Sequence, residues 1–287
     1  MRHPAKLLSL ATIAALFTTV DVAASQPHGF FAATRSLRQT PLHYAQANSR
    51  QAEADRLFEQ GVERLDTSQI SQFQEAIQFL EQALAIYRET GNPAREAETL
   101  SVLGFAYGEV GQYRQAIETY EHGLPIVREI GDNSEERRIL QGLGDIYIRV
   151  NQYEQALEAY EQALAIVQES DSVWVRRNES RLLVVIGNAL MALGQQQQAM
   201  VANEQALAIA QEIDDPDRAN RALISLGDEH MAFSQHQQAL EAYELALTNA
   251  REANRPSTVG SVLIKMGNAY MALGQQQQAL AAYEQAI

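Results

Sequence analysis

The sequence predicts an all-α solenoid built from repeated helix-turn-helix hairpins, and three observations lead to this fold class. An apolar-glycine pair recurs at a nearly constant spacing, an alanine follows each glycine at a fixed distance, and a residue that is usually tyrosine follows each alanine. Alanine, glutamine, glutamate and leucine are abundant, and all four favour helices. A repeat period between roughly 20 and 50 residues is typical of solenoids and related arrays.

The repeat can be followed through five regular units and one irregular unit. The apolar-glycine pairs lie 40, 43, 40 and 40 residues apart, at Leu103-Gly104, Leu143-Gly144, Ile186-Gly187, Leu226-Gly227 and Met266-Gly267. Twelve residues after each glycine stand Ala116, Ala156, Ala199, Ala239 and Ala279. Four residues later stand Tyr120, Tyr160, Asn203, Tyr243 and Tyr283. The earlier unit is irregular because Gly61 precedes Ala76 by 15 residues. We therefore expect six units, near residues 51–90, 94–130, 134–169, 177–213, 217–253 and 257–287.

Each unit is predicted to be a hairpin of two amphipathic helices. The small glycine of the first helix and the small alanine of the second allow the two backbones to approach closely. The breaks between the helices are expected at Gly111, Asn151, Gly194, Ser234 and Gly274. The four glutamines that follow Gly194 and Gly274 are then the opening turn of a second helix, not a low-complexity tract.

The N-terminus has the pattern of a secretory signal peptide. Arg2, His3 and Lys6 precede an apolar run from Leu7 to Val20, and small residues follow. We expect a signal peptide over residues 1–25, a linker over 26–49 and the repeat array over 50–287. The protein is then exported, to the periplasm or the medium, and has no membrane contact after cleavage. An uncleaved anchor is the alternative, although a membrane span needs about 20 apolar residues.

Composition argues against several classes of function. The chain has no cysteine, which excludes disulfides and thiolate chemistry. Its net charge of −14 argues against nucleic acid as a partner. No catalytic or phosphate-binding motif occurs, and His230 and His236 are interpreted as substitutes for other residues at repeat positions. We expect no enzyme activity, no metal and no cofactor.

The segment LGDIYIRVNQYEQALEAYEQALAI and its sister segments resemble tetratricopeptide repeats, whose pattern combines Leu-Gly-x-x-Tyr with an alanine, an aromatic residue and a final proline. The 40-residue period resembles the longer subtype of polarity adaptors and kinesin light chains. The resemblance covers about residues 50–287. It implies a right-handed α-solenoid that binds other proteins, with the first helices lining the concave side.

The resemblance also implies which residues line the concave groove. They lie six and three residues before the motif glycine, and one, four and five after it. The six-before position gives a basic row, Arg138, Arg181 and Arg221. The one-after position gives a row of amides and carboxylates, Asp145, Asn188, Asp228 and Asn268. The four-after position gives a methionine row, Met191, Met231 and Met271.

Together the three rows suit a protein or peptide partner that carries acidic and apolar residues. Arginine can hold a carboxylate through two hydrogen bonds, asparagine can bond a peptide backbone, and methionine adapts to varied apolar side chains. In the alternative interpretation, the arginines pair with Asp145 and Asp228 and only hold the groove in shape. Trp174, in the junction with the 43-residue spacing, is expected either to fill that junction or to anchor a partner.

Two further alternatives concern the ends of the array. Its N-terminal part is similar to exported bacterial, cyanobacterial-type repeat proteins, in many of which a CHAT domain follows. This similarity implies an alternative function, the sensing or regulatory arm of a caspase-like peptidase whose catalytic domain lies beyond Ile287. The last unit ends part-way through its second helix, which leaves an apolar face open. Self-association through the last repeat is therefore also expected as an alternative.

Overall fold

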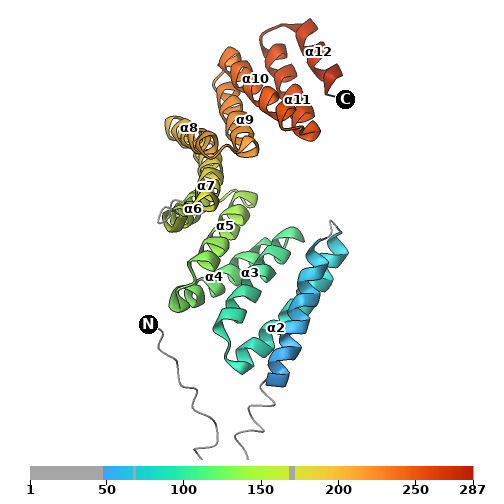
Figure 1. Ribbon diagram of the computed structural model, residues 1–287, viewed down its shortest axis with the longest axis vertical. Helices are drawn as coiled ribbons and strands as arrows, with labels where there is room; N and C mark the ends of the chain where they lie inside the picture. The colour runs from blue at the N-terminus through green and yellow to red at the C-terminus, as the bar shows by residue number, and fades with distance from the viewer. Residues whose placement is uncertain (1–47, 67–68, 168–171, 287) are drawn as a thin grey trace, which may run out of the picture. The chain divides into compact units, whose positions relative to one another are not determined.

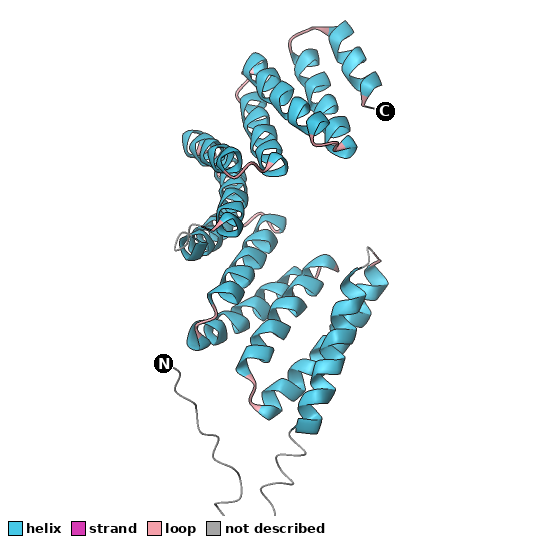
Figure 2. Ribbon diagram, in the orientation of Figure 1, coloured by secondary structure: helices cyan, strands magenta, loops and turns pink. Residues whose placement is uncertain are grey.

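The computed structural model describes residues 48–66, 69–167 and 172–286. In these ranges the chain forms helices joined by short turns, with no strand (Figure 2). The predicted all-α, right-handed α-solenoid is confirmed. The predicted signal peptide and the predicted linker up to residue 47 lie outside the described residues. No helix within the described ranges is both long and apolar enough to cross a membrane.

The helices follow one another as hairpins through the compact unit Arg50–Ile287 (Figure 1). The first hairpin consists of a helix over residues 48–63, the 3-10 turn η1 (Arg64–Asp66) and α2 (Ile70–Thr90). The others are α3 (Pro93–Glu109) with α4 (Tyr113–Ile130), α5 (Asn133–Arg149) with α6 (Tyr153–Val167), α7 (Val173–Ala192) with α8 (Gln196–Glu212), α9 (Pro216–Ala232) with α10 (His236–Glu252), and α11 (Pro256–Ala272) with α12 (Gln276–Gln285). We call the first helix of each hairpin its A helix and the second its B helix. The fourth hairpin begins at Val173, earlier than the predicted residue 177.

The turns within the hairpins depend on residues that accept a left-handed backbone. All five predicted break residues have positive φ, from 59° at Ser234 to 77° at Gly111. Glycine adopts this conformation without a steric penalty, and asparagine tolerates it better than most residues. The residue types at the breaks therefore follow from the backbone geometry of the turn.

Each hairpin is held together by a B-helix side chain that packs over the A-helix glycine. A Cβ atom added to Gly227 would lie 2.2 Å from a ring carbon of Tyr243, and Gly104, Gly144 and Gly267 face tyrosine rings in the same way. In the irregular first hairpin, Leu80 takes the place of the tyrosine over Gly61. The close approach predicted from the small residues is confirmed, and the aromatic ring sets the distance between the two helices.

The fourth hairpin departs from this pattern at Asn203, which stands where the others carry tyrosine. The amide of Asn203 is fully buried and donates a hydrogen bond of 2.7 Å to Glu229 Oε1 of α9. Glu229 is 2% exposed and replaces the alanine or isoleucine of its sister positions. The smaller asparagine and the larger glutamate thus fill the space between hairpins four and five with a polar pair. Within the described residues, Asn203 Oδ1 and Glu229 Oε2 have no hydrogen-bond partner.

Burial changes the protonation of Glu229. Removal of the carboxylate from water raises its pKa from 4.5 to about 7, although the hydrogen bond from Asn203 acts in the opposite direction. The charges of Glu204 and Asp228 raise the pKa further. The folded protein therefore binds this proton more tightly than the unfolded chain, and stability falls as pH rises from about 4.5 to about 7.

Glu229→Gln is expected to stabilise the protein at pH 8 and to leave it nearly unchanged near pH 4.5. Glutamine has the same shape, carries no charge and can donate to Asn203 Oδ1. The charged glutamate costs about 3 kcal/mol above pH 7 by the linkage between pKa and stability, so the gain at pH 8 is of this order. Thermal unfolding at both pH values, with the exposed Glu241→Gln on α10 as the control, measures the difference. A gain that is equal at both pH values would contradict the titration of Glu229.

Gly227→Ala is expected to destabilise the array by about 1–3 kcal/mol although alanine favours helices, because the new methyl group meets the ring of Tyr243. Gly260→Ala is the matched control in another A helix, since its Cβ would meet only the Ala286 carbonyl oxygen at 3.3 Å. We expect this control to be neutral or to gain up to about 1 kcal/mol. Urea unfolding followed by circular dichroism compares the two variants, and equal effects would argue against the packing of tyrosine on glycine.

Candidate partner-binding site

The predicted basic row lies on three successive A helices, with Arg138 on α5, Arg181 on α7 and Arg221 on α9. Arg138 forms an ion pair with Glu135 of its own helix. Arg181 donates to Gln141 Oε1 at 3.2 Å, and Arg221 forms no ion pair with a carboxylate of the described residues.

None of these arginines pairs with Asp145 or Asp228. The interpretation that such pairs hold the groove in shape is therefore wrong. The two carboxylates accept instead from B-helix tyrosines, and Asp228 also accepts from Lys265 of α11.

The predicted row of amides and carboxylates is tethered by B-helix tyrosines. The Tyr160 hydroxyl donates to Asp145 at 2.6 Å and the Tyr243 hydroxyl donates to Asp228 at 2.6 Å. Burial, with the adjacent carboxylate, raises the pKa of each tyrosine. Tyr283 donates to Asn268 at 2.7 Å in the same way, whereas Asn188 is exposed and Asn203 of its hairpin makes no such bond. Lys265 of α11 also donates to both Asp228 oxygens at 2.8 Å.

This row therefore has a structural role as well as a place on the predicted groove. Each tyrosine joins the interior of a hairpin to the residue that follows the motif glycine. A partner would have to share these oxygens with the tyrosines, and Asn188 is the member of the row that remains open.

The methionine row is only partly open. Met191 and Met231 are half-buried and pack against the core of their hairpins. Met271 is 51% exposed. The apolar contact predicted from the sequence is thus mainly available at α11.

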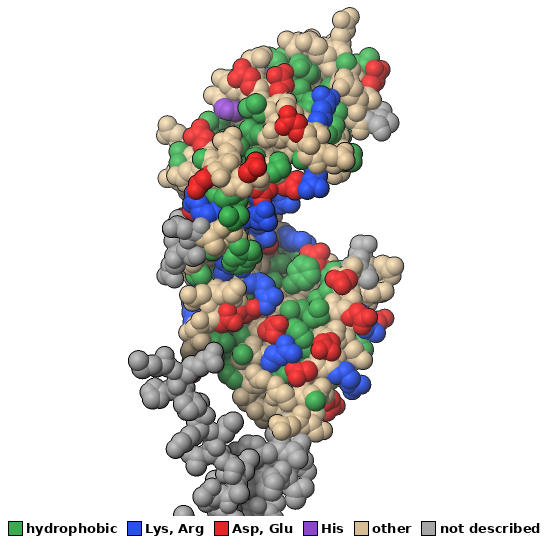
Figure 3. Space-filling model, in the orientation of Figure 1, with side chains coloured by type: hydrophobic (Ala, Val, Ile, Leu, Met, Phe, Trp, Pro, Cys, Tyr) green, Lys and Arg blue, Asp and Glu red, His purple; other side chains and the backbone are tan. Residues whose placement is uncertain are grey.

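Two further arginines lie near the basic row and were missed by the analysis of the sequence. Arg137 of α5 donates to Gln141 Oε1 at 3.2 Å, and Arg218 of α9 is half-buried with no ion pair to a described carboxylate. Burial and the charges of neighbouring arginines lower the pKa of both, and Arg181 contributes in each case. Lys and Arg side chains accordingly gather near the middle of the array in the space-filling view (Figure 3).

Gln141 connects the third and fourth hairpins beneath these arginines. The residue is only 6% exposed, and its Oε1 atom accepts hydrogen bonds from both Arg137 and Arg181. Its Nε2 atom is buried without a partner among the described residues. An arginine can only donate hydrogen bonds, and the amide oxygen of Gln141 accepts them without carrying a negative charge. Gln141 therefore orients two guanidinium groups without neutralising either of them.

Trp174 lies beside the same arginines and is 56% exposed. The guanidinium of Arg137 stacks on its ring, 4.9 Å from the centroid. Trp174 is therefore only partly buried at the junction, where it contacts the preceding hairpin through Arg137. The ring presents an open aromatic surface next to the arginines.

A polar cavity of about 430 Å³ opens where α3 and α5 begin. Charged side chains dominate its lining: Arg95, Glu98, Asp132, Glu135, Arg137 and Arg138. Asp132 caps α5 and accepts from the backbone N–H of Glu135. Its carboxylates are engaged, because Glu98 pairs with Arg95 and Glu135 pairs with Arg138. The cavity extends the arginine region toward the second hairpin.

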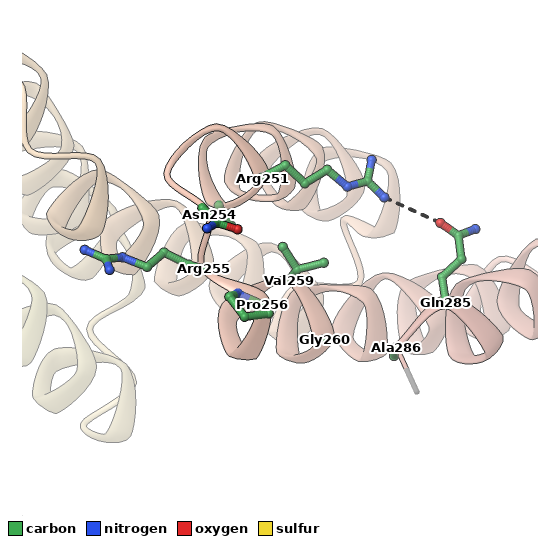
Figure 4. A pocket seen from close by; sticks show the side chains of 9 residues that line it. Arg251, Asn254, Arg255, Pro256, Val259, Gly260, Gln285 and Ala286 are labelled. Carbon is green, nitrogen blue, oxygen red and sulfur yellow. Dashed lines mark hydrogen bonds between the residues drawn. The ribbon is translucent and has the colours of Figure 1, made fainter.

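A second cavity, of about 380 Å³, lies at the turn between α10 and α11 (Figure 4). Arg251 donates to Gln285 at 3.5 Å along one side of it. An equivalent cavity is lined by residues 40 positions earlier in the chain, where Pro216 corresponds to Pro256 and Asp214 corresponds to Asn254. This recurrence indicates that both cavities arise from the geometry of the repeat.

His230 and His236, the two histidines singled out in the sequence, differ in their hydrogen bonds. His230 Nδ1 is hydrogen-bonded to Gln235 at 2.7 Å, and His236 Nδ1 is buried without a partner in the described structure. No group of three or more His, Asp or Glu side chains in the described ranges is placed to hold a metal ion.

Comparison with known proteins identifies the repeat. A tetratricopeptide-repeat family model matches residues 68–129 and 95–169, and a second tetratricopeptide-repeat model matches residues 260–287. No curated protein matches the chain. The chain thus contains tetratricopeptide repeats, which form its α-solenoid. Proteins of this class are generally non-catalytic protein-interaction scaffolds.

Three solved structures illustrate the likeness of fold. BtubC (BKLC) from P. vanneervenii has 22% identity and a TM-score of 0.64, with 75% of this chain and 89% of that chain covered. PH0952 from Pyrococcus horikoshii, a signal transduction ATPase with a tetratricopeptide-repeat sensor, has 17% identity and a TM-score of 0.67, with 82% and 36% covered. A Rap protein complexed with competence and sporulation factor has 16% identity and a TM-score of 0.58, with 82% and 72% covered. The export, the association with a CHAT peptidase and the self-association stay predictions.

Proposed function

We propose that the protein is a non-catalytic scaffold that captures a peptide or a helix on the concave side of its A helices. The observation that carries this proposal is the basic row, which repeats at one register on α5, α7 and α9 and does not pair with the neighbouring aspartate row. Arg181 and Arg221 form no ion pair with a carboxylate of the described residues, so they are suited to carboxylates of a partner, whereas Arg138 already pairs with Glu135.

The remaining rows support the same proposal. Asn188 is exposed on α7, two turns further along the helix than Arg181, and can bond a peptide backbone. Met271 offers an adaptable apolar surface on α11. The Rap protein of similar fold holds its own partner, the competence and sporulation factor, which supports the idea that such an array accommodates a ligand.

We further propose that the protein acts after export, guided by a signal peptide over residues 1–25. The charged start, the apolar run and the small residues that follow it support this proposal. The intact mass of the native protein is expected to be lower than that of the full chain by the mass of this segment. Recovery of the segment on a membrane-bound protein would favour the uncleaved anchor instead.

The binding proposal can be tested by selecting peptides from a random display library on the immobilised protein. The triple variant Arg138→Ala, Arg181→Ala, Arg221→Ala is expected to bind the selected peptides at least about ten-fold more weakly, because each arginine offers a charge-assisted hydrogen bond. Its helical circular dichroism spectrum should stay unchanged.

The matched control changes three B-helix arginines, Arg88, Arg114 and Arg251, to alanine, so that the net charge changes equally. We expect this control to bind the selected peptides like the unmodified protein. An equal loss in both triple variants would show that net charge, and not the basic row, governs binding. Failure to select any peptide would argue against the scaffold proposal.

A further inference from the structure

Four arginines near the middle of the array form no ion pair with a carboxylate in the part of the chain that the structure describes, although the charges of Glu135 and Asp215 attract Arg137 and Arg218. They lie on three successive A helices, and we call them the basic cluster: Arg137, Arg181, Arg218 and Arg221. Two neighbouring arginines differ, because Arg138 pairs with Glu135 and Arg177 pairs with Asp215 at 2.6 Å. The carboxylates close to the cluster are thus already taken.

Asp217 of α9 is the nearest further candidate to neutralise the cluster. Its charge interacts with Arg218 and Arg221, but its two oxygens accept from Arg255 at 2.8 and 2.7 Å. The described part of the chain therefore leaves the cluster with unbalanced positive charge.

This arrangement costs free energy in the isolated protein. The positive charges lie close enough to lower the pKa of Arg137 and Arg218, in both cases after the larger effect of burial. The chain has a net charge of −14, so repulsion among these arginines is a local feature and not a consequence of composition. An anionic ligand at the cluster would relieve it.

The structure holds two members of the cluster, Arg137 and Arg181, in place by means other than ion pairs. Gln141 Oε1 accepts from Arg137 and Arg181, and the ring of Trp174 supports Arg137. Both contacts fix guanidinium groups and leave their charges uncompensated. Such preorganisation lowers the entropy that binding a ligand would cost.

The spacing of the cluster matches an extended peptide. Arg181 and Arg221 occupy the same register on α7 and α9, and these helices pack directly. Packed helix axes lie roughly 8–10 Å apart, and an extended chain advances about 3.3 Å per residue. Carboxylates about three residues apart in an extended segment would therefore reach Arg181 and Arg221.

The surroundings favour a peptide over a nucleic acid. Asp145 and Asp228 lie two turns further along the same helices as the arginines, and the protein as a whole is acidic. A continuous phosphate backbone would be repelled outside the cluster, whereas a peptide can place separate acidic side chains only where arginines stand.

We propose that the basic cluster binds side-chain carboxylates spaced about three residues apart in an extended partner peptide, with Trp174 offering an aromatic contact beside them. This inference rests on the proposed function and specifies the chemistry of the partner. It concerns internal acidic side chains and not a C-terminal carboxylate.

The test uses the full protein and short dye-labelled peptides with amidated C-termini and no aromatic residues. One peptide carries aspartates at intervals of about three residues. The second carries the same aspartates in one consecutive block, and the third has asparagine in place of each aspartate. Anisotropy of the dye reports binding anywhere on the protein. The fluorescence of Trp174, the sole tryptophan of the chain, reports binding beside the cluster.

We expect the spaced peptide to bind at least about ten-fold more tightly than the other two and to change the fluorescence of Trp174. The variant Arg181→Ala, Arg218→Ala, which keeps the contact between Arg137 and Trp174, should weaken the spaced peptide by about ten-fold or more. The control Arg114→Ala, Arg251→Ala on B helices should bind it like the unmodified protein.

The outcomes separate this inference from the scaffold proposal. If library-selected peptides bind but neither acidic spacing nor the cluster variant matters, the scaffold stands and the inference is wrong. Anisotropy changes without a response from Trp174 would likewise overturn it, because the ligand would then lie elsewhere. Tighter binding of a short single-stranded DNA than of the spaced peptide, lost in the same variant, would assign the cluster to nucleic acid.

Discussion

The packing of a B-helix tyrosine over an A-helix glycine is the contact on which the rest of the structure depends. The ring of Tyr243 occupies the space that a Cβ of Gly227 would need, so it sets the distance between the two helices. The hydroxyl of the same ring donates to Asp228, the residue directly after the glycine. Because Asp228 lies on the face predicted to meet a partner, the hairpins of Tyr160, Tyr243 and Tyr283 each couple their core to that predicted face through one side chain. A change in either place is therefore expected to affect the other.

The fourth hairpin shows what happens when that tyrosine is absent. Asn203 cannot reach the position after the glycine, and Asn188 is left without the tether that Asp145 has. The vacated space is filled by Glu229 of the next hairpin, at a position where small or apolar residues stand elsewhere in the array. The smaller Asn203 and the larger Glu229 thus compensate each other in volume, but Glu229 introduces a buried ionisable group. The same substitution that frees Asn188 for a partner also makes the packing of hairpins four and five depend on pH.

The fold could be predicted because the spacing of glycine, alanine and tyrosine is local and repeats in one register. The basic row could be predicted for the same reason, since Arg138, Arg181 and Arg221 share a register. Arg137 lies one residue before Arg138, and Arg218 lies three residues before Arg221. Both were missed because the groove was predicted from fixed offsets to the motif glycine, and these offsets do not include their positions. The exposure of Trp174 could not be predicted, because it depends on how the longer junction places α7 against Arg137.

The distribution of charge gives the basic cluster its selectivity. Most of the molecule carries acidic groups, and a net charge of −14 repels an acidic partner from most approaches. On α5 and α7, however, Gln141 and Trp174 hold Arg137 and Arg181, which form no ion pair with a carboxylate of the described residues. An acidic segment is therefore attracted at one place and repelled elsewhere, which fixes both its position and its orientation. A neutral peptide is neither attracted by the cluster nor repelled by the acidic surface. A uniformly anionic polymer is repelled by the acidic surface along most of its length. Discrimination then arises from the contrast between the cluster and its acidic surroundings, so changes to distant acidic residues are expected to alter specificity as well as affinity.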